Sequence, residues 1–246
     1  MKTSILALAL TLTLTSAIAQ RGQNKIKLST NITTETKDIT GFDKIEVSED
    51  FNVYIRVADK EEIRIKANEN LHSLIQVEQK GTTLKIYTDP YSYSYNNRKK
   101  NSAKEVLTAY ITVKELSQIT ADEDVNIIVD GIVEAEELTI RLSEDCTLEG
   151  NFLTKNLYIH MNEDCVLDIA GSAQTMEVKA DEDCDLMGKK FTVQDLAINL
   201  NEDSTAKLIV NGDIDLLARE DSYFSYRGTG RFVSKKLRED SEVGSW

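Results

Sequence analysis

Apolar and polar residues alternate along most of the chain, in short runs separated by polar segments. Alternation at every second position is the pattern of a β-strand that buries one face. No window keeps the i, i+3, i+4, i+7 spacing of an amphipathic helix. The pattern therefore predicts an all-β protein. The clearest apolar positions, which we expect in its core, are Leu138, Ile140, Leu142, Leu157, Ile159, Met161, Leu196, Ile198 and Leu200.

A Glu-Asp pair recurs between these runs at nearly constant spacing. Its glutamates lie at positions 123, 144, 163, 182, 202, 220 and 239, so the steps between successive copies are almost equal. A further copy, Glu49-Asp50, lies far upstream of the first. Short strands in such coils can bury their apolar faces by stacking on the next coil. The repeat predicts a single-stranded parallel β-helix, right-handed as parallel crossovers generally are, with coils of about 19 residues.

The Glu-Asp pairs are predicted to lie at turns. A continuous strand through Leu142, Glu144 and Cys146 would bury the glutamate beside its apolar neighbours, and an unpaired buried carboxylate is costly. A corner or bulge at the pair instead turns both side chains towards solvent. Equivalent carboxylates on adjacent coils then lie about 4.8 Å apart, and their repulsion should raise some of their pKa values.

The solenoid repeats are expected to cover residues 114–246. Residues 36–113 also alternate as strands but are less regular, and they hold one long loop at 88–105. We therefore predict an N-terminal β region that joins the solenoid in one continuous domain, 36–246. Residues 20–35, which are rich in Thr, Asn and Lys, are interpreted as a linker.

The N-terminal segment, 1–19, has the pattern of a secretory signal peptide. Lys2 is followed by an uncharged stretch dominated by Leu and Ala, which ends in Ala17-Ile18-Ala19 before Gln20. The alternative, an N-terminal membrane anchor, fits less well because the apolar part is short and interrupted by Thr. We expect an exported protein of the periplasm, the outer cell surface or the medium, with no transmembrane segment after cleavage.

The charge balance excludes one class of partner. With 29 basic and 42 acidic residues the net charge is −13, whereas nucleic acids are bound by clustered Lys and Arg. The only dense basic run follows three tyrosines in the long loop. Loops often carry function, and tyrosines suit sugar or protein surfaces, so this loop is a candidate binding site. The alternative, a disordered loop without a binding role, is given equal weight. The candidate residues are Tyr91, Tyr93, Tyr95, Arg98, Lys99 and Lys100.

The three cysteines, Cys146, Cys165 and Cys184, are evenly spaced at the length of one coil. In a solenoid they would stack in one column, where neighbouring side chains point the same way and suit disulfide geometry poorly. Their number is odd, and their spacing is unlike that of zinc ligands. We expect them to be buried and unbonded, in a column that requires a small side chain.

No metal site and no cofactor are expected. Stacked carboxylates attract cations, and Ca²⁺ takes oxygen ligands, so a weak calcium-binding solenoid is one alternative. However, the glycine-rich calcium repeat and the EF-hand loop are both absent from the sequence. The weak candidate ligands are Glu144, Asp145, Glu163, Asp164, Glu182, Asp183, Glu202 and Asp203.

Two segments carry a resemblance to a known family. They are Gly41-Phe42-Asp43-Lys44-Ile45-Glu46-Val47 and Val77-Glu78-Gln79-Lys80-Gly81-Thr82-Thr83-Leu84-Lys85-Ile86-Tyr87, and repeated strand-turn units follow. With these, the chain resembles the exported bacterial proteins called putative auto-transporter adhesins, head GIN domain, over about residues 38–246. The resemblance implies a right-handed β-helix in the cell envelope. The family's repeated turn is small and neutral, whereas this chain places two acids there.

The sequence shows few features of an enzyme. It has two histidines, His72 and His160, and lacks the common nucleophile, zinc and phosphate-binding motifs. We therefore expect no enzyme but a cell-envelope adhesion or structural module that binds a cell-surface glycan or protein. The alternative is a carbohydrate-active β-helix enzyme, a polysaccharide lyase or hydrolase. The oligomeric state is left open.

Overall fold

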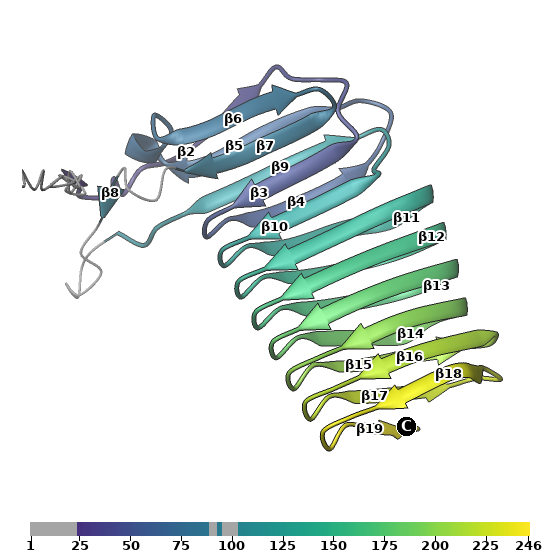
Figure 1. The fold of residues 1–246 in the computed structure, drawn as a ribbon. Coiled ribbons are helices and arrows are strands. Elements are labelled where there is room, and N and C mark those ends of the chain that lie inside the picture. The colour runs from purple at the N-terminus through teal and green to yellow at the C-terminus, as the bar shows by residue number, and fades with distance from the viewer. Residues whose placement is uncertain (1–23, 89–92, 95–102) are drawn as a thin grey trace, which may run out of the picture.

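The computed structural model describes residues 24–88, 93–94 and 103–246, and these are mostly β-strand. The strands wind into a β-solenoid of about seven turns (Figure 1). The prediction of an all-β parallel solenoid is confirmed. Within the described residues, no helix is long and apolar enough to cross a membrane. The predicted signal peptide, 1–19, lies outside the described residues.

The regular part of the solenoid is built from strands that stack in parallel register. Leu138, for example, pairs with Leu157 of the next coil, and Leu157 pairs in turn with Met176. Inward positions therefore stay inward from coil to coil. The strands are β10 (Gln118–Asp122), β11 (Asn126–Ser143), β12 (Thr147–Asn162), β13 (Val166–Asp181), β14 (Asp185–Leu200), β15 (Thr205–Val210), β16 (Asp213–Ala218), β17 (Tyr223–Arg227), β18 (Arg231–Leu237) and β19 (Glu242–Gly244).

The N-terminal region extends the same stack. Its elements are β1 (Asn24–Lys25), β2 (Ile32–Lys37), β3 (Lys44–Ser48), β4 (Asn52–Val57), β5 (Glu62–Asn68), the short 3₁₀-helix η1 (Glu69–Leu71), β6 (Ile75–Lys80), β7 (Thr83–Thr88), β8 (Tyr93–Ser94) and β9 (Leu107–Val113). β3 and β4 form one coil, because they lie parallel to β10 and to the first part of β11. β7 and β9 form the next coil outward, because they lie parallel to β3 and β4.

This arrangement explains the isolated upstream copy of the repeat. After the β3–β4 coil, the chain runs through the outer coil and returns to β10 on the other side of β3. Ser48 thereby pairs with Asp122, and the Glu49 N–H donates to the Asp122 carbonyl at 3.1 Å. Glu49-Asp50 is thus the turn directly above Glu123-Asp124. In the outer coil, β7 and β9 take the places of β3 and β4, and the sequence between them holds no Glu-Asp pair.

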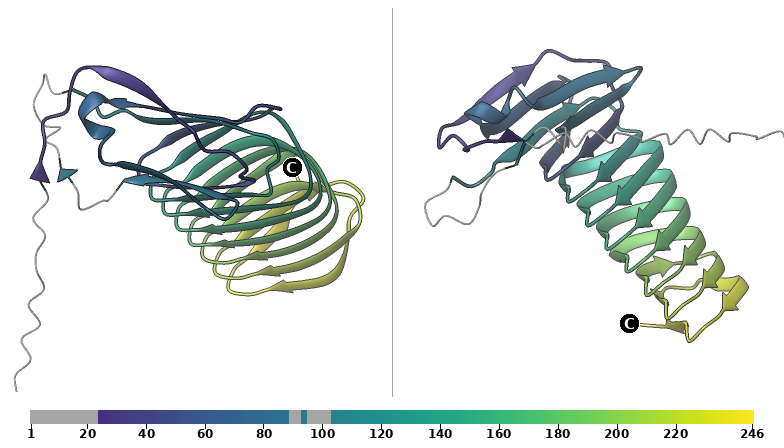
Figure 2. Two further views of the ribbon diagram at one scale, coloured as in Figure 1. Left: turned by 90° about the horizontal axis from the view of Figure 1, so that it is seen from above. Right: turned by 60° about the vertical axis from the view of Figure 1, so that its left-hand side comes forward.

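Antiparallel strands cover the N-terminal end of the stack (Figure 2). β5 pairs with β9 on one side and with β2 on the other, and β6 forms a hairpin with β7. The predicted linker at 20–35 is therefore wrong for its last residues, since β2 begins at Ile32. Thr33 and Glu35 contribute backbone hydrogen bonds to the cap rather than to a free segment.

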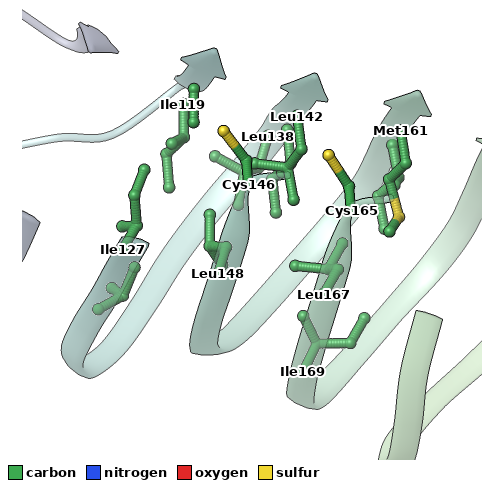
Figure 3. Packing of buried hydrophobic residues seen from close by; sticks show 14 of the residues in the cluster. Ile119, Ile127, Leu138, Leu142, Cys146, Leu148, Met161, Cys165, Leu167 and Ile169 are labelled. Carbon is green, nitrogen blue, oxygen red and sulfur yellow. The ribbon is translucent and has the colours of Figure 1, made fainter. Parts of the chain in front are cut away.

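The core is one continuous set of stacked apolar columns, and Figure 3 shows a part of it. All nine residues expected in the core are buried. Cys146 and Cys165 lie on adjacent coils, next to Leu148 and Leu167 of the same two coils (Figure 3). All three cysteines are buried and free of disulfide bonds, as predicted.

The bend on the far side of one coil requires glycine at one position. Gly171 has a φ of +113°, and a Cβ at this position would lie 2.1 Å from the backbone oxygen of Phe152. Phe152 is fully buried and pairs in register with Gly171. Only a residue without a side chain allows β12 and β13 to approach this closely at the bend.

Candidate binding surfaces

The eight Glu-Asp pairs form tight turns along one edge of the stack, after the arrowheads of β11–β14 in Figure 1. All sixteen residues have φ between 48° and 69°, and no other described non-glycine residue has a positive φ. Two successive left-handed residues are the geometry of a type I′ turn. From Glu123-Asp124 onward every pair is exposed. The prediction of outward-facing turns is confirmed.

A ladder of backbone hydrogen bonds holds the turns together. From Asp50 to Asp221, the N–H of each aspartate of a pair donates to the carbonyl of the glutamate one coil further on, at 2.8–3.0 Å. Asp145, for example, donates to Glu163, and Asp164 donates to Glu182. The left-handed backbone directs these groups along the solenoid axis. The turns are therefore structural elements, whatever their side chains bind.

In three coils the buried residue that follows the pair closes the turn from inside. The Cys165 thiol donates to the Asn162 carbonyl at 3.2 Å, and the Ser222 hydroxyl donates to the Arg219 carbonyl at 2.7 Å. Each bond spans the turn from the residue after the pair to the residue before it. Cysteine and serine suit these turns because both are small and can donate this hydrogen bond, whereas Phe51 and Val125 fill the same position of the first two turns without one.

The carboxylates of the turns form an acidic edge with mutual repulsion. The charge of Asp122, followed by desolvation and the charge of Glu163, raises the pKa of Glu144. Desolvation, with the charges of Glu163 and Glu202, raises the pKa of Glu182. The expected rise is confirmed for these two groups. The last four pairs, 182–183, 202–203, 220–221 and 239–240, line a groove of about 460 Å³.

The predicted weak metal ligands all lie on this acidic edge. They stack in two rows, one of glutamates and one of aspartates, that follow the solenoid axis. Within the described part of the chain, no group of three or more His, Cys, Asp or Glu residues is arranged to hold a metal ion. The expectation that the edge holds no metal ion stays a prediction.

Beside the acidic edge, a shallow hollow of about 360 Å³ lies on the outer face of the adjoining strands. One row of its lining residues comes from the same position of four successive coils, where Arg141 pairs with His160, His160 with Lys179, and Lys179 with Asn199. Arg141 and Lys179 are exposed. Lys179 also lies 3.4 Å from Glu177, in a solvent-exposed ion pair.

A second row of polar residues completes the hollow, two positions further along each coil. Asn201 Nδ2 donates to Asp181 Oδ1 at 2.6 Å. Arg219 Nη2 lies 3.5 Å from Asn199 Oδ1, while its Nε is buried without a hydrogen-bond partner. The remaining polar members of this row are Ser143 and Asn162.

His160 occupies the centre of the basic row. Burial, followed by the charges of Arg141 and Lys179, lowers the pKa of this histidine, and Glu177 opposes the shift. The shift favours the neutral imidazole. Sequence reasoning named His160 but did not connect it with its neighbours. The available signal was the even spacing of Arg141, His160 and Lys179, each one coil length after the last.

A tyrosine pair forms a third surface feature. The rings of Tyr54 and Tyr110 stack with centroids 5.2 Å apart, and the Arg64 guanidinium lies 5.3 Å from the Tyr110 centroid. These residues are register partners on adjacent strands, so the rings stand on edge and cover one another's faces. A sugar ring stacks on an open aromatic face. The pair is therefore better suited to stabilising the N-terminal coils.

The predicted binding loop lies almost wholly outside the described residues. Tyr91, Tyr95, Arg98, Lys99 and Lys100 are not among them. The backbone of the remaining member, Tyr93, belongs to β8, which pairs in parallel with β1. The role of this loop stays a prediction.

The sequence pattern of one protein family matches residues 41–230, which is most of the chain. The family is described as Putative auto-transporter adhesin, head GIN domain. The chain belongs to this family. The match begins after β2 and ends before β18, and it includes all but the last of the acidic turns. The resemblance expected from the sequence is thereby confirmed.

This head GIN domain chain is also similar to solved structures. A putative adhesin from Bacteroides fragilis superposes with a TM-score of 0.77 at 18% identity, over 89% of this chain and 98% of that one. A putative lipid binding protein from Parabacteroides distasonis superposes with a TM-score of 0.72 at 14% identity, over 91% and 100% of the two chains. At these identities the likeness shows the fold alone. No curated protein matches the chain.

Proposed function

We propose that the protein is exported to the cell envelope and acts there, without catalysis, as an adhesion module that binds a cell-surface glycan or protein. Family membership and the signal-like N-terminus support this assignment. The fold suits it as well, because a solenoid presents long, nearly flat outer faces rather than a deep enclosed pocket. The solved structures of similar fold include two described as a putative adhesin, from Bacteroides fragilis and Parabacteroides merdae.

The observation that carries the proposal is the ordering of outward side chains into rows. Parallel register repeats each outward position at about 4.8 Å along the axis. Arg141, His160 and Lys179 form such a row, and the acidic turns form others. Rows of fixed spacing match an extended ligand with a repeating structure, such as a surface polysaccharide.

A glycan array probed with the purified exported protein tests this function, together with a cell-binding assay. We expect binding to a defined subset of glycans or to intact cells, with no change in the bound molecule. Turnover assays on the same polysaccharides run in parallel. Absence of binding to every glycan and cell type would contradict an adhesion role.

One observation favours a second candidate, a polysaccharide lyase. His160 favours the neutral form and lies between two cations, which is an arrangement that can neutralise a sugar carboxylate and remove the neighbouring proton. Elimination would then form a double bond in the sugar as the glycosidic C–O bond breaks, and the leaving oxygen would take up the proton that His160 had removed. The appearance of this ultraviolet-absorbing product from an acidic polysaccharide, and its loss in His160→Ala, would favour the lyase over the adhesion module.

A further inference from the structure

The hollow beside the acidic edge gathers positive charge in a chain whose net charge is −13. Its lining includes Arg141, Lys179 and Arg219, against a single carboxylate from Asp181. That carboxylate already accepts a hydrogen bond from Asn201. The hollow is therefore locally cationic, although the surface next to it is strongly anionic.

The cationic groups of the hollow have N–H donors that are unpaired or only weakly paired. Arg219 Nε is buried without a hydrogen-bond partner, and buried polar groups in folded proteins are nearly always paired. Arg141 takes part in no ion pair with a described residue. The ion pair of Lys179 with Glu177 is about half exposed at both ends, so it competes weakly with an incoming anion. An anionic ligand would supply hydrogen-bond acceptors to Arg219 and Arg141, and it would compete with Glu177 for Lys179.

The arrangement also specifies the shape of the ligand. Arg141 and Lys179 lie two coils apart, or about 9.5 Å along the axis. The amides and hydroxyl of Asn162, Asn199 and Ser143 lie beside them, and they suit sugar hydroxyls better than an apolar side chain. A chain of sugars with carboxylates at intervals offers both kinds of partner in one linear molecule.

We propose that this hollow binds the carboxylates of an acidic polysaccharide that lies along the solenoid axis. The guanidinium groups of Arg141 and Arg219 take the carboxylates, Lys179 adds a third positive charge, and the amides bind the hydroxyls. This inference rests on the proposed adhesion function and names its ligand class and its site. It also places the contact away from the long loop in which the sequence analysis expected binding.

Calorimetric titration of the exported protein with a homogeneous oligogalacturonate tests the inference. The fully methyl-esterified form of the same oligosaccharide is the control ligand, because it keeps the sugar and removes the charge. The test variant is Arg141→Gln/Lys179→Gln. The matched control is Lys155→Gln/Lys190→Gln, which removes two exposed lysines at the bend and the same total charge. Melting temperatures of all variants establish that each is folded.

We expect the wild-type protein and the bend variant to bind the acidic oligosaccharide alike. The hollow variant should bind it at least about tenfold more weakly, since two charge-assisted hydrogen-bonding groups are lost. The methyl ester should not bind. Equal binding by the hollow variant, or by the methyl ester, would overturn the proposal. Equal binding of a poly-glutamate peptide of the same charge would overturn its sugar specificity.

The proposed function and this inference fail in different ways. Wild-type protein that adheres to cells or binds other glycans on the array, but does not bind the oligogalacturonate, overturns the site and leaves the adhesion function standing. Wild-type protein that binds neither cells nor any glycan on the array contradicts both.

Discussion

Replacement of a single turn glutamate measures the backbone strain that the acidic edge contains. Glu182 has a φ of 56° and an exposed side chain. The left-handed conformation costs an L-residue about 1–2 kcal/mol. Glycine removes this cost but loses about 0.5–1 kcal/mol more conformational entropy on folding than a residue with a Cβ. Glu182→Gly should therefore gain about 0.5–1 kcal/mol from the backbone alone.

The effect of the charge on stability must be separated from the effect of the backbone conformation. Glu182→Gly also removes a carboxylate, whose pKa is raised by desolvation and by the charges of Glu163 and Glu202. Glu182→Gln is the matched control, since it removes the same charge and keeps the Cβ. In urea unfolding followed by circular dichroism, we expect the glycine variant to be about 0.5–1 kcal/mol more stable than the glutamine variant. A glycine variant that is no more stable than the glutamine variant would refute the argument that these turns are strained.

Three further predictions concern the bend, the buried column and the basic row. Gly171→Ala should destabilise the fold by about 2–5 kcal/mol in urea unfolding, because the new Cβ meets the Phe152 backbone at positive φ. Cys165→Ser should stay within about 1 kcal/mol of wild type because its hydroxyl can still donate across the turn, whereas Cys165→Leu should lose about 1–3 kcal/mol through overpacking. Arg141→Gln should raise the pKa of His160 in an NMR titration, and an unchanged pKa would exclude the guanidinium as a cause. Since folding lowers this pKa, the wild-type protein should lose stability as the pH falls below about 6.5, and the Arg141→Gln variant should lose less.

The solenoid could be predicted because its signals are local and repeated. Period-two alternation gives the strands, and the Glu-Asp spacing gives the coil length. The position of Glu49-Asp50 could not be predicted in the same way. Its neighbour, Glu123-Asp124, is distant in the sequence, and the intervening chain forms an outer coil and a cap before it returns. Which coil lies next to which depends on long-range pairing that no local pattern encodes.

The basic hollow was not predicted from the sequence, for a related reason. Arg141, His160 and Lys179 are evenly spaced, but the next coil is longer and the one after it is shorter. A bulge between Asp168 and Ala170 absorbs one of these changes. Arg219 joins the hollow from a different position of the repeat, directly before the Glu220-Asp221 pair, so it shares no even spacing with Arg141, His160 and Lys179. Outward residues also lack the apolar alternation by which a core is recognised.

The closeness of the acidic edge to the basic hollow restricts which polyanions can bind. Ser143 lines the hollow, and its chain neighbour Glu144 belongs to the edge, so the two surfaces lie within the Debye length of about 8 Å at physiological salt. Duplex nucleic acid carries closely spaced charges along its whole axis, and some of these would meet the edge whenever others met the hollow. A polysaccharide with one carboxylate per sugar can place its charges over Arg141 and Lys179 and keep them off the turns. The strong negative charge of the chain therefore does not oppose an acidic ligand in general, but selects one whose charges are sparse and aligned with the coils.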